Sequence, residues 1–64
     1  MKQTTVFTMK NGTQHAVTLV NPSNPDLFKT MNFKKFEHVV LNSGDGRFVV
    51  LNPKYIVSVE ITER

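Results

Sequence analysis

The sequence predicts an all-β fold: a small, strongly bent five-stranded antiparallel barrel with one short helix between the second and third strands. Segments rich in β-branched and aromatic residues recur along the 64-residue chain, and turn-forming residues separate them. One intervening stretch lacks this pattern and carries helix-start signals instead. A chain of this length has room for one hydrophobic core, so residues 1–64 are expected to form a single domain.

The first two strands are predicted to form a hairpin. Residues 3–9 are rich in Thr, Val and Phe, and residues 13–20 provide the return strand. Asn11-Gly12 lies between them and is the strongest short hairpin signal, because a type I′ turn needs positive φ at both central positions.

A short helix is expected over about residues 25–32. Asn21-Pro22 ends the preceding strand, Asn24 is suited to cap a helix, and Pro25 fits its first position. The apolar side of this helix, which would hold it against the barrel, consists of Leu27, Phe28 and Met31.

The third and fourth predicted strands span residues 37–42 and 47–51, joined by a turn at residues 43–46. Apolar residues occur on both faces of these strands, whereas a half-exposed sheet alternates more cleanly. We therefore expect both faces to be covered, or one of them to be joined to another subunit.

The last strand is predicted over residues 56–61. Pro53 cannot donate to a strand ladder, so the fourth strand ends at Asn52, and Pro53-Lys54-Tyr55 is expected to form one tight 3₁₀-like turn. Such a turn redirects the chain so that a fifth strand can close a small barrel of the SH3-like or Sm-like type.

Three short patterns resemble the Sm-like barrel of the bacterial Hfq RNA chaperones: V-x-x-x-x-N-G at residues 6–12, F-x-x-V-V-L at residues 36–41, and Y-I-V-S-V at residues 55–59. The resemblance implies an oligomeric barrel that binds RNA. The chain departs from that family by beginning with a strand. In place of the family's Tyr-Lys-His signature it has Asn52-Pro53-Lys54, so only Lys54 keeps a basic residue there.

Composition narrows the function classes. The chain has no cysteine, which suits a reducing cytoplasm, and neither a disulfide nor a zinc-thiolate site is expected. The histidines do not cluster with metal-ligand spacing, so neither metal nor cofactor is predicted. No apolar run is long enough to cross a membrane. Net charge is +3, and residues 1–36 carry five lysines against a single aspartate.

The function is expected to be non-enzymatic. His38, Ser43 and Asp45 are close in sequence, but no nucleophile-elbow motif accompanies them. The leading hypothesis is a self-associating module that binds single-stranded RNA or DNA through basic and aromatic side chains. These are Lys29, Phe33, Lys34, Lys35 and Lys54.

Within this set Phe33 is expected to be open, while Phe28 and Phe36 pack into the barrel. Tyr55 is expected to pack its ring, and His15 to be a surface residue.

The alternative interpretation is a protein-interaction or structural accessory protein of a bacterium or phage. In that case the apolar faces would bind a protein, and the charges would only provide solubility.

Overall fold

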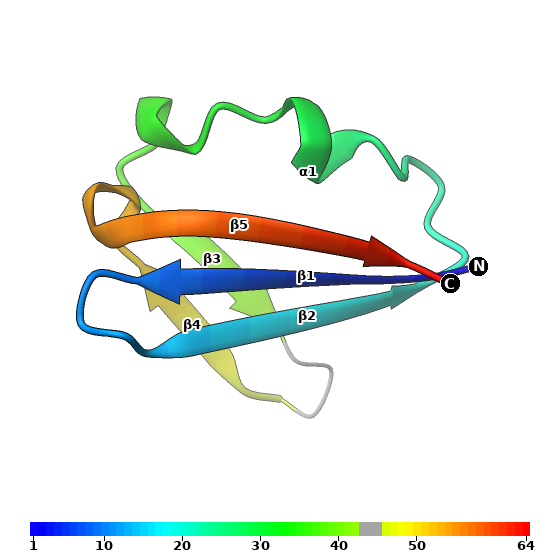
Figure 1. Cartoon of the computed structure of the whole chain (residues 1–64), viewed down its shortest axis with the longest axis horizontal. Coiled ribbons are helices and arrows are strands. Elements are labelled where there is room, and N and C mark those ends of the chain that lie inside the picture. The colour runs from blue at the N-terminus through cyan, green and yellow to red at the C-terminus, as the bar shows by residue number, and fades with distance from the viewer. Residues whose placement is uncertain (43–45) are drawn as a thin grey trace.

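The computed structural model describes residues 1–42 and 46–64, which form two antiparallel sheets (Figure 1). The predicted turn at residues 43–46 falls mostly outside the described residues. The three-stranded sheet has the order β2-β1-β5, and the two-stranded sheet pairs β3 with β4. The strands are β1 (Lys2–Met9), β2 (Gln14–Val20), β3 (Val39–Asn42), β4 (Phe48–Leu51) and β5 (Ile56–Glu63).

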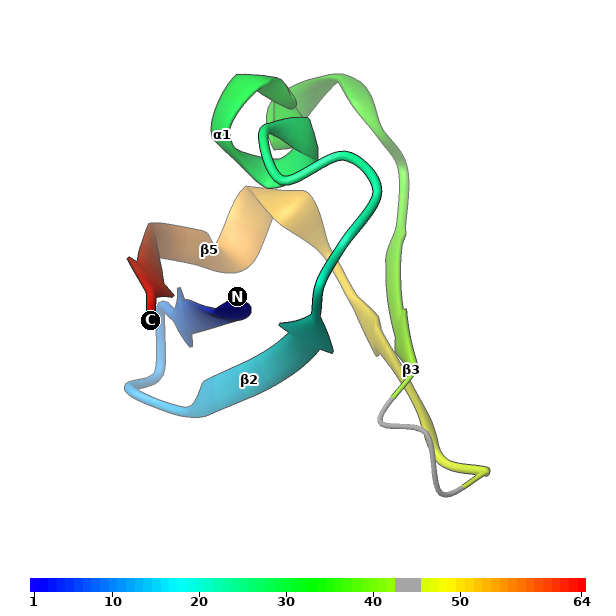
Figure 2. The ribbon, with the colours of Figure 1, turned by 90° about the vertical axis from the view of Figure 1, so that its right-hand side faces the viewer.

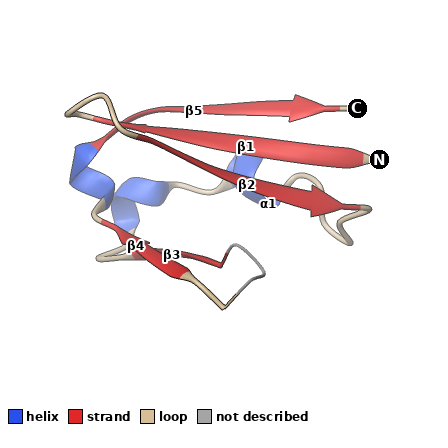
Figure 3. Ribbon diagram, turned by 90° about the horizontal axis from the view of Figure 1, so that it is seen from below, coloured by secondary structure: helices blue, strands red, loops and turns tan. Residues whose placement is uncertain are grey.

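The sheets lie in two layers, and the β3–β4 hairpin crosses one face of the three-stranded sheet (Figures 1 and 3). The all-β prediction and its strand order along the chain are confirmed, but a closed barrel is not. Within the described part of the chain, β2 and β3 lie in different sheets. The long connection between them, residues 21–38, begins at Asn21 with a φ of 47°, which turns the chain away from the sheet.

The β1–β2 hairpin forms where it is predicted, but with a different turn. The amide of Met9 donates to the Thr13 carbonyl (2.8 Å), and the amide of Gly12 donates to the Met9 carbonyl (2.9 Å). Gly12 has a φ of 90°, whereas Asn11 is not left-handed, so the type I′ prediction is wrong. The three-residue loop with one left-handed glycine is the next commonest hairpin connection.

The connection from β2 to β3 contains two short helical turns. The predicted helix is confirmed in place but is shorter: α1 spans Leu27–Thr30, and its N-cap Asp26 makes no side-chain capping bond. A second, unpredicted 3₁₀ turn, η1, spans Phe33–Lys35 and begins with the Asn32 side chain accepting from the Lys34 amide (3.2 Å). These turns lie along one open side of the sheet pair (Figure 2).

The 3₁₀ turn predicted between the last two strands is confirmed as η2 (Pro53–Tyr55). It starts like η1: the Asn52 side chain accepts from the Lys54 amide at 3.0 Å. After the turn, β5 pairs with β1, and the register shifts near Met9, which pairs with Ile56 while Thr8 pairs with Ser58. This irregularity leaves Val57 without a partner and 67% exposed.

The hydrophobic core lies between the two sheets. Its buried apolar residues are Phe7, Phe33, Val39, Leu41, Leu51 and Ile56. Phe7 is fully buried and meets the rings of Phe28 and Phe33 edge-on, with centroid separations of 6.0 and 5.3 Å. Edge-to-face pairs at such distances add to the stabilisation from burial.

Candidate functional site

The fold uses two members of the predicted nucleic-acid set for its own structure. Phe33 is only 9% exposed and belongs to the core, so the expectation that its ring is open is wrong. The expectation that Phe36, outside this set, packs into the fold is also wrong, because Phe36 is 50% exposed. The Lys34 ammonium donates to the carbonyls of Pro53 (2.7 Å) and Ile56 (3.2 Å). Lys34 therefore joins η1 to η2.

Lys29 is also engaged within the molecule. Its ammonium forms ion pairs with Asp26 (3.5 Å) and with Glu63. The hydrogen bond with Glu63 raises the pKa of Lys29, and the same bond, followed by one from Gln3, lowers the pKa of Glu63. Two carboxylates beside this lysine offset its charge, so Lys29 is a weak candidate for binding phosphate.

Lys35 at the end of η1 and Lys54 in the middle of η2 remain exposed. Lys54 adjoins a hollow on the surface, because the next residue, Tyr55, forms one of its walls. Lys34, Lys35 and Lys54 thus lie on two turns that contact each other, whereas Lys29 pairs with Glu63 and Phe33 is buried.

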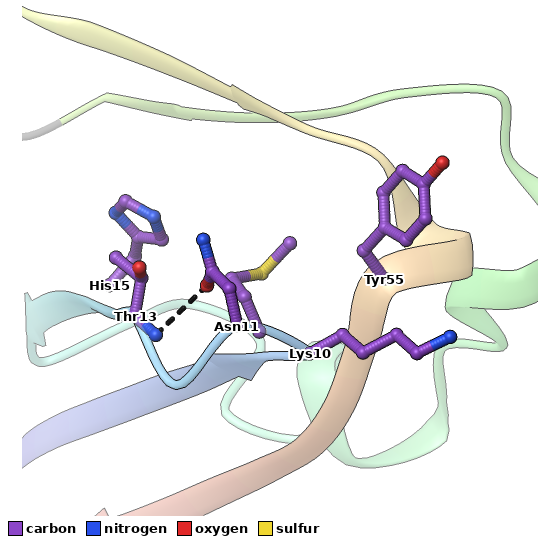
Figure 4. A pocket seen from close by; sticks show the side chains of 6 residues that line it. Lys10, Asn11, Thr13, His15 and Tyr55 are labelled. Carbon is purple, nitrogen blue, oxygen red and sulfur yellow. Dashed lines mark hydrogen bonds between the residues drawn. The ribbon is translucent and has the colours of Figure 1, made fainter.

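A groove of about 550 Å³ lies beside the β1–β2 turn (Figure 4). Its lining residues are Met9, Lys10, Asn11, Thr13, His15 and Tyr55. In Figure 4 the His15 and Tyr55 rings stand on opposite sides, with Asn11 between them. The Lys10 side chain runs past the base of Tyr55, so its ammonium lies beyond the tyrosine.

Backbone hydrogen bonds fix the two walls of the groove. The amide of Lys10 donates to the Tyr55 carbonyl at 2.7 Å, which ties the end of β1 to the end of η2. Across the turn, the Asn11 side chain accepts from the Thr13 amide at 3.0 Å. With its carbonyl oxygen used in this way, the Asn11 side chain still has its amide NH₂ group as a donor.

The groove combines aromatic faces with positive charge. Tyr55 is 53% exposed, so the expectation that its ring packs into the fold holds only in part. His15 is half-buried and lines this surface groove. None of the described residues that line the groove carries a carboxylate. Such a site suits a flat neutral ring attached to an anionic group.

Sequence reasoning gave Lys10, Asn11, His15 and Tyr55 no shared role. Both turns that build the groove are visible in the sequence, as Asn11-Gly12 and as Pro53-Lys54-Tyr55. Their proximity depends on the pairing of β1 with β5, which joins opposite ends of the chain.

The described residues contain neither a cluster of metal ligands nor a membrane-spanning helix. In residues 1–42 and 46–64, no three histidine or acidic side chains gather closely enough to hold a metal ion. The helices of this part of the chain are too short to span a membrane. Comparisons with protein-family models, curated proteins and solved structures gave no significant match.

Proposed function

We propose that the protein is a non-enzymatic module that binds single-stranded RNA or DNA in the groove beside the β1–β2 turn. The observation that carries the proposal is the half-exposed Tyr55 ring, which stands in an open groove and has two lysines as neighbours. Lys10 lines the groove and Lys54 precedes the tyrosine in the chain. An unpaired base would stack on Tyr55, and the backbone phosphates on either side of that base would contact the ammonium groups of Lys10 and Lys54.

The size and chemistry of the groove favour a single strand over a duplex. A volume of about 550 Å³ lies within the range of roughly 300–1,000 Å³ found for small-molecule pockets, and therefore suits one or two nucleotides. Stacking on an aromatic side chain requires a base that is free of its own stack. Because every base has a flat face, weak sequence preference is expected.

The test is fluorescence anisotropy with labelled oligouridine and oligothymidine at about 50 and 200 mM salt. Phosphate contacts weaken steeply over this range, because binding releases counterions. Tyr55→Ala should weaken binding by about 5- to 150-fold, the equivalent of roughly 1–3 kcal/mol for one stacked base. Tyr55→Phe keeps the ring and should bind nearly as well as the wild type.

The lysines have a matched control on the same strand. Lys10→Glu places a negative charge at the groove, whereas Lys2→Glu makes the same change at the opposite end of β1. Lys10→Glu should weaken binding at least about tenfold more than Lys2→Glu, since the screened effect of a charge falls off over about 10 Å. Equal losses would show that only net charge matters and would contradict the assignment of the groove.

A second candidate function is protein interaction, which is favoured by apolar side chains that lie exposed away from the groove. Phe48 and Val50 are 65% and 61% exposed on β4. Binding through such a surface would be insensitive to salt, and this separates it from phosphate binding. If neither oligonucleotide binds at either salt concentration, this candidate takes first place.

A further inference from the structure

The outer face of the β3–β4 hairpin is an exposed apolar surface. Residues alternate along each strand: Val39, Leu41 and Leu51 are buried against the core, whereas the intervening Val40 and Val50 are 59% and 61% exposed. The register sets Val40 directly opposite Val50 and Asn42 opposite Phe48. Four outward positions from two strands thus form one continuous surface without a charged residue.

This face differs from the outer face of the three-stranded sheet. On the outward side of β1, β2 and β5, polar residues outnumber apolar ones. The polar residues include Thr4, Thr8, Thr18, Ser58, Glu60 and Thr62, and the apolar ones are Val6, Ala16 and Val20. A sheet face that meets water is normally mostly polar, as this one is. The hairpin departs from the pattern in the same molecule, which indicates that its outer face is covered.

The apolar face also has a projection and a hollow of its own. Phe48, 65% exposed, lies at the end where β3 finishes. A shallow hollow of about 220 Å³ lies along β3, between the outer face and the core. Its lining residues are Phe28, Met31, Phe36, His38, Val39, Val40 and Leu41. Along the hairpin, the Val40–Val50 pair lies between Phe48 and the start of β3, which Phe36 precedes by three residues, so a two-fold rotation about an axis beside this pair exchanges the two ends of the hairpin.

The exposed apolar area approaches that of a dimer interface. Phe36, Val40, Phe48 and Val50 are each 50–65% exposed. With roughly 150–250 Å² for a whole aromatic side chain and less for a valine, they present on the order of 300–400 Å² of apolar surface. A standard interface buries about 800 Å² per partner, of which about 500 Å² is apolar in homodimers. The match is close for so small a chain, and an isolated two-stranded sheet gains stability from a second covering layer.

We propose that a second copy of this chain covers the outer face of the β3–β4 hairpin, forming a two-fold homodimer. The two hairpins stack face to face with the Val40–Val50 pairs at the centre. Phe48 of each copy enters the hollow beside Phe36 of the other. Each residue contact then occurs twice, as two-fold symmetry requires. The proposal is independent of nucleic-acid binding, because the face and the groove share no residue.

The first test is sedimentation velocity on the full chain from about 5 µM to 500 µM, at about 50 and 500 mM salt. A dimer that persists at high salt is expected, since an apolar interface does not depend on charge attraction. Val50→Glu should raise the dimer dissociation constant at least about 100-fold, because it buries an unpaired carboxylate. Val20→Glu is the matched control: Val20 is 68% exposed, lies on β2, and should leave the dimer unchanged.

A second variant decides the matter if Val50→Glu does not fold. The chain contains no cysteine, so Val50→Cys introduces a single thiol. Near the two-fold axis it should form a disulfide-linked dimer under mild oxidation, and Val20→Cys should not. A wild type that is monomeric at all concentrations would overturn the proposal. A dimer that survives Val50→Glu, or that cross-links through Cys at position 20 alone, would overturn it as well.

Discussion

Replacing Lys34 with alanine should destabilise the fold, although sequence reasoning placed this lysine in a binding surface. The Lys34 ammonium donates to the carbonyls of Pro53 and Ile56, at 2.7 and 3.2 Å. One hydrogen bond to a charged group contributes about 1.5–3 kcal/mol in protected surroundings. Because these bonds are only partly buried and water can replace the ammonium, we expect a loss of about 1–2 kcal/mol.

Lys35→Ala provides the control for this prediction. It removes the same type of side chain from the next position, where the lysine is exposed and makes no bond to the carbonyls of η2. A surface change of this kind stays within about 0.5 kcal/mol. For a domain of 60–100 residues, 1 kcal/mol corresponds to a Tm shift of about 4–8 °C. Lys34→Ala should therefore lower Tm by roughly 4–16 °C.

The assay is thermal and urea unfolding followed by circular dichroism, with all variants at the same protein concentration because dimerisation would also shift Tm. Equal stability of Lys34→Ala and Lys35→Ala would refute the role given to Lys34. So would a Lys34→Ala variant that keeps its stability but loses nucleic-acid binding, because that result would return the lysine to the binding surface.

Two further predictions concern stability. Gly12→Ala should lower the free energy of unfolding by about 1–2 kcal/mol, because a left-handed φ of 90° strains any residue that has a Cβ. The strain comes from the backbone, since no atom lies within 4 Å of the added Cβ. An unchanged midpoint in urea unfolding would contradict the turn geometry. Glu63 has a lowered pKa in the folded state, mainly through Lys29, so its stabilising contribution is present above roughly pH 4.3 and is lost as the pH falls through its folded pKa. Glu63→Gln should flatten the acid side of the pH–stability curve, and an identical curve would contradict the ion pair.

Local sequence signals predicted the elements of this fold well. The β-branched runs gave the strands, and Pro53 after Asn52 gave the 3₁₀ turn. Asn32 carries the same signal as Asn52, since each is followed two residues later by a lysine whose amide it caps. Reading both together would have predicted η1. It would also have placed Phe33 in the core, because the first residue of each turn is buried.

Features that depend on contacts between distant segments were not predictable in the same way. Barrel closure requires β2 to pair with β3, and local propensity does not determine whether two strands meet. The groove likewise joins Lys10 to Tyr55 through a backbone hydrogen bond across 45 positions of the chain. Lys54 was included in the predicted site because of the resemblance to Hfq, and it does precede Tyr55, which lines the groove. The RNA-binding role that the resemblance implies remains a prediction.

The most direct test of the central claim is a titration of ¹⁵N-labelled protein with unlabelled oligouridine, followed by amide chemical shifts. Binding in the groove predicts that the largest shifts occur at residues 9–15 and 54–56, with little change near Lys34 and Lys35. Shifts confined to residues 29–35, or no shift at about 50 mM salt, where phosphate contacts are strongest, would contradict it.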